Sequence, residues 1–540
     1  MTPRRLVRRI RRELGRRVAW TRGTAGPGPR SDVAIPTGAG WGPSVLVIVI
    51  DGLRPDRITM SDTPTLHRLR SEGVWFADAR AVAPTGTRVN AAAISTGAHP
   101  ARNGILGNAV NVRGAGGARS LRTQRLEDLE RAALEGEVLT APTLASVLAD
   151  RGRQLVALSS ASTGSAWLLA PEAAAGAGAV VNGAFGRGER AAYPDALDDV
   201  VRTRFGPAPR KARIGRPRTE LVRWTDRVLS ELVLPELRPD VTIAWICEPD
   251  HTQHAFGVGS PQARRALAEV DGLLGDLLAR LAALGLEDRT DLLVLSDHGG
   301  IRYEQAIDVG GFLVASGLKL GSGSPDVLIA PAGPSVQISI ERDDPARLEA
   351  IVSALQAEPW CGPLFSRAGE VAGTFPLELV HLDHPERSCD LLITFGWDDR
   401  ANGFGVAGTG FTSVGSGRAL HSGHGGLSPY EMRTTFLARG PSFRDGHTVS
   451  TPVGHVDVVP TVLEILGIRP TEAPEGRVLT EALRGRADPP PEVARESFDT
   501  MNRDGSFHAA LQASVVDGRR YLDAAWRATE PSPRIASSAG

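Results

Sequence analysis

The 540-residue sequence has little lysine, few cysteines and no long hydrophobic run. Lysine occurs only at Lys211 and Lys319, and with abundant alanine and glycine this arginine bias is typical of a high-GC bacterium. No stretch approaches the roughly 20 apolar residues that a membrane-spanning helix needs. The formal net charge is −1, so the overall charge gives no indication of specific nucleic-acid binding.

Cysteine is equally scarce. Cys247, Cys361 and Cys389 are widely spaced, and an odd, scattered set excludes a disulfide framework and a thiolate zinc site. This usage fits a reducing compartment and predicts a cytoplasmic protein, although exported bacterial proteins also often lack cysteine. Hydrophobic residues make up 41% of the chain, which is enough for a large core.

The first 22 residues are strongly basic. A helix there would gather apolar side chains on one face and arginines on the rest, a pattern typical of a helix lying on an anionic membrane surface. A disordered basic tail and a start codon assigned too early are the alternatives. A secretory signal is not expected, because its continuous apolar core is missing. The apolar residues are Val7, Ile10, Leu14 and Val18, and the single acid is Glu13.

Three aspartates stand where apolar runs stop. Asp51 ends VLVIVID, Asp250 ends VTIAWICEPD, and Asp297 lies in DLLVLSDH. Such continuous runs predict strands buried on both faces, as in a parallel sheet. In open α/β sheets ligands bind outside the carboxyl ends of the strands. Carboxylates and imidazoles gathered at that edge predict a site for two divalent metals.

The pattern along the chain predicts three regions. Residues 1–42 form the basic tail and a Gly/Pro-rich linker, residues 43–490 form an α/β main domain, and residues 491–540 form a C-terminal extension. Antiparallel strands over about 301–420 are expected to form an insertion that caps the sheet edge. Asp517-Gly518 between two short strands predicts a hairpin in the extension.

Within the main domain, strand and helix signals alternate. Strands are expected at 45–50, 154–159, 241–250, 291–298 and 434–438, and at 336–340 and 390–395 in the insertion. Helices are expected at 65–72, from Thr87, and at 141–150, 219–232, 262–284 and 456–466. Ser260 and Pro261 favour a helix start before the long helix, and residues 160–218 are expected to be mostly Ala- and Gly-rich loops.

Two pairs of ligands follow from spacing. Asp250 and His254 are four residues apart, so one helical turn places both on one face. Asp297 and His298 are adjacent at a strand end, where both can turn toward one ion. For either pair alone, a helix cap or a packed histidine is the more ordinary explanation.

The segment 83–108 (APTGTRVNAAAISTGAHPARNGILGN) contains two further candidates. Thr87 stands at a predicted helix start, where the helix dipole favours an anion. If bound to zinc, its hydroxyl is expected to act as a nucleophile on phosphorus, whereas alone it would be an ordinary N-cap. Asn108 ends a Gly-rich turn and can donate to a developing negative oxygen, or be a simple turn residue.

In this order, DGLRPDR, PTxTxxN…STGxxPxxxGILGN, EPDxxxH, SDHG and a late GHGG resemble the alkaline phosphatase superfamily. The most similar branch is the type I phosphodiesterase/nucleotide pyrophosphatase family, and the likeness covers roughly residues 44–470. The resemblance implies an alkaline-phosphatase-like three-layer α/β sandwich with a mostly parallel central sheet and a small antiparallel capping insertion.

The resemblance also implies two Zn²⁺ ions. Asp51, Asp297 and His298 would hold one ion, with Thr87 as the nucleophile bound to it. Asp250, His254 and His424 would hold the other. His421 and His424 are both possible from spacing alone, and the glycine after His424 favours His424. Asn108 would help hold the phosphoryl oxygens.

This site would hydrolyse phosphodiester or pyrophosphate bonds of a small nucleotide, phosphodiester or phosphonate substrate through a phospho-threonine. Two departures from the family bear on the substrate. Arg88 follows the nucleophile where the nucleotide pyrophosphatases usually have an aromatic residue, and Gln253 replaces a usual glycine. Both put nucleotide specificity in doubt.

Other functions are weighed against this one. A phosphonoacetate-hydrolase-like enzyme and a phosphomonoester hydrolase are the main alternatives. A sulfatase lacks support because its Cys/Ser-x-Pro-x-Arg motif is absent, and phospholipid-headgroup transferases usually carry membrane spans. A metal-free pseudoenzyme acting as a binding module would be expected to have lost a ligand or the nucleophile, yet every matched position holds a workable side chain.

Overall fold

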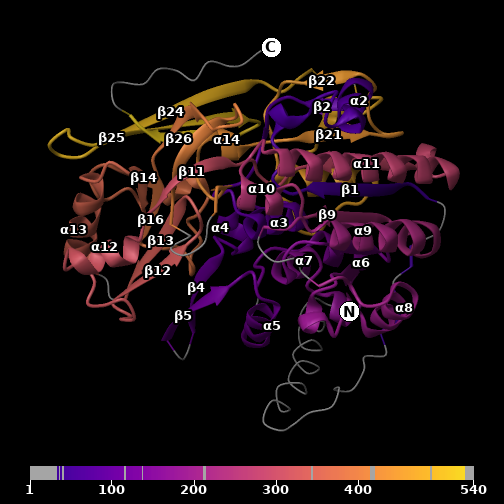
Figure 1. The fold of residues 1–540 in the computed structure, drawn as a ribbon, viewed down its shortest axis with the longest axis horizontal. Helices are drawn as coiled ribbons and strands as arrows, with labels where there is room; N and C mark the ends of the chain where they lie inside the picture. Colours follow the sequence, from indigo (N-terminus) through magenta and orange to yellow (C-terminus); the bar gives the residue numbers. More distant parts are fainter. Residues whose placement is uncertain are drawn as a thin grey trace, which may run out of the picture.

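A computed structural model describes residues 33–35, 37–38, 42–114, 117–136, 138–210, 215–341, 344–413, 420–486 and 489–528. Within these residues a large sheet is flanked by helices, and a second β-rich unit lies beyond one end of its central strands (Figure 1). The arginine-rich segment, and with it the predicted membrane contact, lies outside the described residues. In the part of the chain that is described, no helix has the length and apolar character needed to cross a membrane.

The central sheet has nine strands, and its middle is parallel. β10, β1, β9, β6 and β7 run in one direction, while β21 and β8 pair antiparallel at either side of this block. The order across the sheet is β22 (His447–Val449), β2 (Val74–Phe76), β21 (Phe436–Arg439), β10 (Thr290–Leu295), β1 (Ser44–Ile50), β9 (Val241–Ile246), β6 (Leu155–Ser159), β7 (Ala179–Val181) and β8 (Ala192–Tyr193). The predicted mostly parallel sheet is confirmed.

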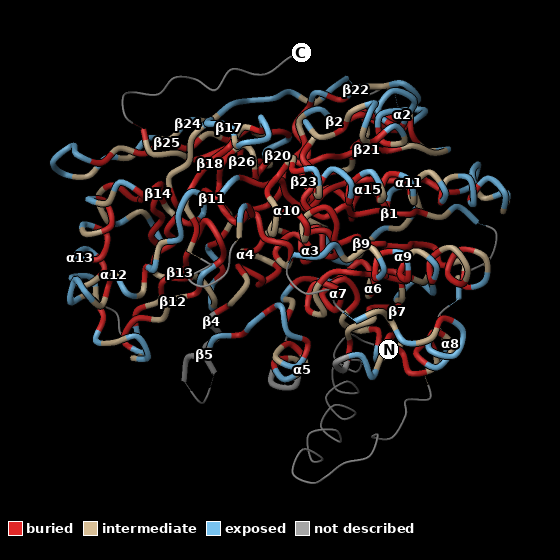
Figure 2. Tube along the Cα trace, viewed as in Figure 1, coloured by how far each residue is buried: buried red, intermediate tan, exposed pale blue. Residues whose placement is uncertain are grey.

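The three strands that carry the aspartates are neighbours. β1 lies between β10 and β9, with Ile48 opposite Val294 on one side and Ala244 on the other. Every residue of β9 is buried, as is β1 after its first residue (Figure 2), and β10 is buried throughout. These three apolar strands are therefore covered on both faces of the sheet, as predicted from the absence of alternating polar residues.

Helices cover the sheet in two groups. One group packs together through α11 and consists of α2 (Pro64–Glu72), α9 (Thr219–Val228) and α11 (Pro261–Ala283), with α8 (Asp195–Phe205) beside α9. The other packs around α3 (Thr87–Thr96) and consists of α6 (Leu144–Ala149), α7 (Thr163–Leu169) and α15 (Val458–Ile465). With the sheet these groups make the three layers expected.

The longest helix, α11, shows how the sequence determines this packing. The Ser260 side chain accepts a hydrogen bond from the Ala263 N–H, and Pro261 occupies the first turn. Its buried apolar residues recur three or four positions apart, which puts them on one stripe facing the core. They are Ala263, Ala266, Leu267, Val270, Leu274, Leu277 and Leu281.

One local expectation was wrong, and another was right about a helix but not about its regularity. Residues 160–218, expected to be mostly loops, contain α7, α8 and the strands β7 and β8. The helix expected over 219–232 is regular only to Val228 and continues as a π-helix, Leu229–Leu237. Pro235 lies inside this π-helical segment, where its missing N–H disturbs the regular hydrogen-bond ladder.

The insertion is built from two small sheets and two helices. Most of its strand pairs are antiparallel, and its buried apolar residues form a cluster separate from that of the central sheet. Its elements are β11 (Ile301–Ala306), β17 (Trp397–Ala401), β18 (Ala407–Thr412) and β19 (Ser422–Gly423); β12 (Val327–Pro331), β13 (Ser335–Ile340), β16 (Leu391–Phe395), β14 (Cys361–Ser366) and β15 (Thr374–Pro376); and α12 (Val309–Ala315) and α13 (Pro345–Gln356).

The last described residues form a three-stranded antiparallel sheet, β24 (Val493–Met501), β25 (His508–Val516) and β26 (Arg519–Arg527). Asp517 and Gly518 both have positive φ, 50° and 74°, which is the backbone of a two-residue hairpin turn. Phe507, Leu511 and Leu522 join the hydrophobic cluster of the insertion. The C-terminal sheet is thus packed into the insertion's core.

Shorter elements connect these layers. They are β3 (Ala79–Arg80), β20 (Arg433–Thr434) and β23 (Val453–Gly454) in one small sheet; the hairpin β4 (Ala109–Gly114) and β5 (Gly117–Arg122); and the helices α4 (Pro100–Asn103), α5 (Leu126–Glu135), α10 (Asp250–Phe256) and α14 (Pro429–Met432).

Candidate metal centre and nucleophile

The carboxyl ends of the three central strands bring acidic and imidazole side chains together. Asp51 directly follows β1, and Asp297 and His298 lie two and three residues beyond the end of β10. The Nε2 atom of His298 lies 3.0 Å from Asp297 Oδ2 and 3.4 Å from Asp51 Oδ1. All three side chains are at most 4% exposed. This is a buried cluster of two carboxylates and an imidazole.

A second half of the cluster surrounds Asp250, the first residue of α10. His254, one helical turn later, places Nε2 3.1 Å from Asp250 Oδ2. His424 places Nε2 3.7 Å from the other oxygen, Oδ1, and its ring stacks on that of His298 with centroids 3.4 Å apart. His421, the alternative left open by spacing, is exposed and bonds the His254 carbonyl only through its backbone N–H.

The residues present fit divalent cations. Two sets have ligand atoms that all lie within 4.8 Å of one another, namely Asp51 with Asp297 and His298, and Asp250 with His298 and His424. Asp51 Oδ1 and Asp297 Oδ2 are buried and accept no hydrogen bond from the described residues. Burying a carboxylate oxygen without a hydrogen bond or a counter-charge costs free energy. A bound cation would supply the missing partner for both oxygens.

Backbone carbonyls orient all three histidines in the same way. Their Nδ1 atoms face carbonyl oxygens, so Nδ1 carries the hydrogen and Nε2 keeps its lone pair for the cluster. The pairs are His298 with Gly299 at 2.8 Å, His254 with Ser422 at 2.8 Å and His424 with Thr85 at 2.6 Å. This is the arrangement that metal-binding histidines usually have.

The electrostatics of the cluster are dominated by burial and by its three carboxylates. Burial, with Asp297 and Asp250 nearby, raises the pKa of Asp51 well above its usual value. For Asp250, burial acts in the same direction, but His254, His424 and His298 outweigh it and lower its pKa. Burial opposes protonation of His298, yet Asp297 and the other carboxylates raise its pKa to about 10. The same carboxylates that raise this pKa favour any positive charge placed between them, including that of a bound cation.

Two groups outside the cluster hold its carboxylates. The Trp245 indole N–H donates to Asp51 Oδ2 at 3.0 Å, and the Gly52 N–H donates to Asp297 Oδ1 at 3.1 Å. Gly52 has φ 72°, and a Cβ there would stand 2.9 Å from Asp250 Cβ, so this position requires glycine. Sequence reasoning missed Trp245, because no local signal shows which strand neighbour reaches a carboxylate.

Thr87 faces this cluster. Gly86 is the N-cap of α3 and Thr87 is the first helical residue, so its side chain makes no capping bond. Its Oγ1 lies 3.3 Å from His298 Nε2, and the residue is 5% exposed. A buried hydroxyl at the positive end of a helix, next to carboxylates and imidazoles, is a suitable nucleophile.

Asn108 is tied to the site through Arg88, the residue after Thr87. The Arg88 Nη2 group donates to Asn108 Oδ1. The Asn108 carbonyl accepts bonds from the backbone N–H and the hydroxyl of Thr123, both at 3.0 Å. This Arg88–Asn108 pair joins the start of α3 to the start of β4, and no local pattern predicts it.

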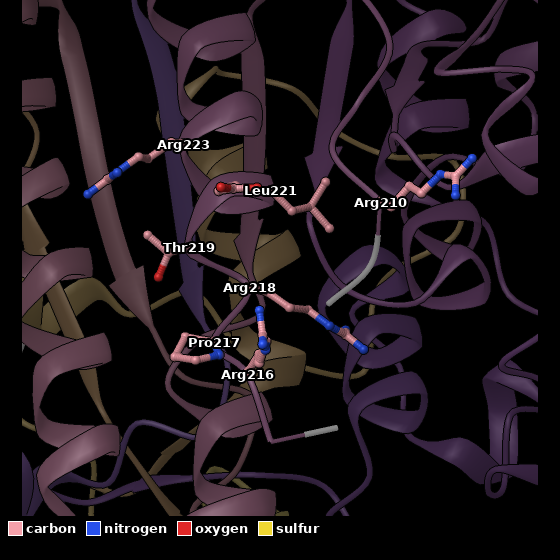
Figure 3. Close-up of a pocket in the computed structure, with 8 residues that line it drawn as sticks. Arg210, Arg216, Pro217, Arg218, Thr219, Leu221 and Arg223 are labelled. Carbon is pink, nitrogen blue, oxygen red and sulfur yellow. The ribbon is translucent and has the colours of Figure 1, made fainter. Parts of the chain in front are cut away.

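A separate cavity of about 750 Å³ lies at the start of α9 and is lined by Arg210, Arg216, Arg218 and Arg223. None of the predicted site residues line it. Figure 3 shows Arg216 and Arg218 close together, while the side chains of Arg210 and Arg223 point away from that pair. The loop before α9 touches α10, because the Arg216 carbonyl lies 3.2 Å from His251 Nε2.

This chain is similar in sequence to a known protein family. The family model described as type I phosphodiesterase/nucleotide pyrophosphatase matches residues 45–398. Bovine bis(5′-adenosyl)-triphosphatase ENPP4 is 26% identical over 257 residues, which are 44% of this chain and 47% of that protein. Human ectonucleotide pyrophosphatase/phosphodiesterase family member 7 is 30% identical over 245 residues, 45% of this chain and 48% of that protein. The chain spans about half the length of these curated relatives.

The fold has a counterpart among solved structures. Murine ectonucleotide pyrophosphatase/phosphodiesterase 5, in an inactive form in complex with AMP, superposes with a TM-score of 0.57 at 19% identity. The match covers 82% of this chain and 100% of that one. It confirms the alkaline-phosphatase-like fold, and the family model spans most of the chain. The extent of the family-model match shows that this chain belongs to the type I phosphodiesterase/nucleotide pyrophosphatase family of hydrolases.

Proposed function

We propose that this protein is a two-zinc hydrolase that cleaves phosphodiester or pyrophosphate bonds through a covalent phospho-threonine at Thr87. One observation carries the proposal. The Thr87 hydroxyl lies 3.3 Å from His298 Nε2, inside a cluster that also contains Asp51 and Asp297. The N-cap of α3 is Gly86 and no side chain caps this helix, so capping does not explain the Thr87 hydroxyl.

Two Zn²⁺ ions fit the side chains present. Asp51, Asp297 and His298 would hold one ion with Thr87, and Asp250, His254 and His424 would hold the other. The unsatisfied oxygens of Asp51 and Asp297 and the Nε2 atoms left free by Nδ1 bonding are the donors zinc prefers. When bound, the ions supply a lowered pKa for the attacking oxygen and positive charge for the phosphoryl oxygens.

The protein's own groups then carry two displacements. Thr87 Oγ1 releases its proton to solvent and forms a bond to phosphorus, while the bond from phosphorus to the leaving-group oxygen breaks and that oxygen takes up a proton from solvent. The Asn108 amide and the N-terminus of α3 donate to the phosphoryl oxygens as charge builds on them. Water then attacks phosphorus from the side the leaving group vacated and releases a proton, while the bond from Thr87 Oγ1 to phosphorus breaks and Oγ1 regains a proton, which leaves free phosphate or phosphoester and the Thr87 hydroxyl.

The substrate we propose is a small phosphodiester or nucleotide. Support comes from the relatives, one named as a bis(5′-adenosyl)-triphosphatase and one solved with AMP. Arg88 follows the nucleophile, so the group beside the phosphorus need not be an aromatic base. A phosphonate or a phosphomonoester would use the same nucleophile, and a substrate panel distinguishes them.

The test compares Thr87→Ala with Thr87→Ser. We expect zinc-loaded wild type to hydrolyse bis-p-nitrophenyl phosphate and the p-nitrophenyl ester of thymidine 5′-monophosphate, Thr87→Ser to keep partial activity, and Thr87→Ala to lose turnover. Acid quenching of wild type should trap phosphate on Thr87, detectable by peptide mass spectrometry. Both variants should bind as much zinc as wild type. Full activity in Thr87→Ala would refute the role of Thr87.

A further inference from the structure

Arg88 is a partly buried cation with unused hydrogen-bond capacity beside the nucleophile. Among the described residues no carboxylate forms an ion pair with it, and its one hydrogen-bonding partner is Asn108 Oδ1. Its Nε–H is buried without a partner. Arginine is rarely left this way, because a buried guanidinium with unmet donors is costly.

The charges of three carboxylates act on Arg88, but no described carboxylate forms an ion pair with it. Burial lowers the pKa of Arg88, and the charges of Asp51, Asp250 and Asp297 act against that effect. These carboxylates are the ones assigned to the cations, so they are not free to neutralise the guanidinium. The start of α3 therefore presents one positive charge, plus the positive end of the helix dipole, on the side of Thr87 where a substrate must bind.

Arg88 also determines how Asn108 faces the site. A guanidinium can only donate hydrogen bonds, so the Asn108 atom in contact with it must be the carbonyl oxygen Oδ1. The Nδ2 amide is then left to donate elsewhere. Because Thr123 holds the Asn108 backbone by two bonds at 3.0 Å, the side chain has a firm base.

From this geometry we infer that Arg88 binds an anionic oxygen of the substrate and selects for a second negative charge at or next to the scissile phosphorus. The preferred substrates would be phosphomonoesters, with both charges on the same phosphorus, or pyrophosphate-linked compounds, with the second charge on the neighbouring phosphate. Simple diesters have one charge and gain less from the arginine. This inference rests on the proposed function, because it places the scissile phosphorus at Thr87.

The test removes the charge but keeps the donor. Arg88→Gln retains an amide N–H for Asn108 Oδ1, and Arg88→Lys retains the charge without the planar fork. Three substrates are compared: p-nitrophenyl phosphate, ATP and bis-p-nitrophenyl phosphate. p-Nitrophenyl phosphate and bis-p-nitrophenyl phosphate share a leaving group and differ in charge. ATP shows whether the second negative charge can lie on the neighbouring phosphate, as in a pyrophosphate, instead of on the scissile phosphorus, as in a monoester.

We expect Arg88→Gln to lower kcat/KM for at least one of the dianionic classes by about 10–100-fold, the range of a lost charge-assisted hydrogen bond, and for the diester by less than about threefold. Arg88→Lys should recover part of the loss. Arg102→Gln, which removes an arginine bonded to Glu472 outside the site, is the matched control and should leave kcat/KM unchanged for all three substrates. Equal losses for all three substrates would reduce Arg88 to a residue that only positions Asn108 and overturn the inference.

A binding measurement separates this inference from the proposed function. Inorganic phosphate at pH 8, where it is a dianion, is titrated calorimetrically into zinc-loaded Thr87→Ala with and without Arg88→Gln. We expect the double variant to bind at least about tenfold more weakly. Equal affinities would overturn the inference whatever the activity. If wild type hydrolyses none of the three substrates, the proposed function fails while the titration still decides the role of Arg88.

Discussion

Replacing Trp245 with phenylalanine is expected to weaken metal binding although it removes no ligand. The Trp245 side chain is fully buried in β9, and its indole N–H donates to Asp51 Oδ2 at 3.0 Å. Phenylalanine keeps an aromatic ring but cannot donate, so Asp51 Oδ2 loses the one hydrogen-bond donor it has among the described residues. A hydrogen bond to a charged group contributes about 1.5–3 kcal/mol, and groups that orient metal ligands change affinity about 10–100-fold.

A matched control separates this effect from the loss of ring volume. Trp224 in α9 is 4% exposed, and its indole N–H has no hydrogen-bond partner in the described residues. Trp224→Phe and Trp245→Phe should each lower the free energy of unfolding by about 1–3 kcal/mol through the space they leave. Only Trp245→Phe should weaken zinc binding, measured by competition with a chromogenic chelator at fixed pH. Equal zinc affinities for the two variants would show that the hydrogen bond from Trp245 to Asp51 does not strengthen metal binding.

Two further predictions concern stability. Burial and the neighbouring His381, whose ring stacks on His99 at 3.8 Å, lower the pKa of His99 well below 6.5, so the unfolded chain takes up a proton there that the folded chain does not. Stability should therefore fall as pH drops below about 6.5, and urea titrations of His99→Gln should show a shallower fall; an unchanged slope would contradict this. Asp523→Asn removes the negative charge that lies 2.9 Å from the buried Arg80 guanidinium. It should lower the free energy of unfolding, measured in urea, by about 1–3 kcal/mol. The exposed Asp499→Asn should cost less than about 0.5 kcal/mol, and equal costs for the two would contradict the assigned role of the Arg80 contact.

What the sequence predicts well is tied to strong local patterns. The strands before Asp51, Asp250 and Asp297 are long apolar runs with no polar alternation, which only a sheet covered on both faces accommodates. Chain direction then places their ends at one edge, so the convergence of the three aspartates needs little more than a parallel sheet. The spacing of Asp250 and His254 likewise becomes one turn of α10.

What the sequence predicts poorly depends on contacts between distant segments. The short helix α7 has the sequence TGSAWLL and is buried from Gly164 to Leu169, so it has no polar face to give an amphipathic pattern, and packing against α3 stabilises it. Its Ser162 cap, which accepts from the Ser165 N–H, was a local signal that could have been used. The bonds from Trp245 to Asp51 and from Arg88 to Asn108 join residues that no spacing rule relates.

If the strand-end cluster binds two metal ions next to the Thr87 hydroxyl, crystals grown with zinc should show both ions by anomalous X-ray diffraction at the zinc edge. We expect two anomalous peaks, one among Asp51, Asp297 and His298 with Thr87 Oγ1 beside it, and one among Asp250, His254 and His424. A single peak, or peaks confined to the surface of the molecule, would contradict the binding of two ions at this cluster.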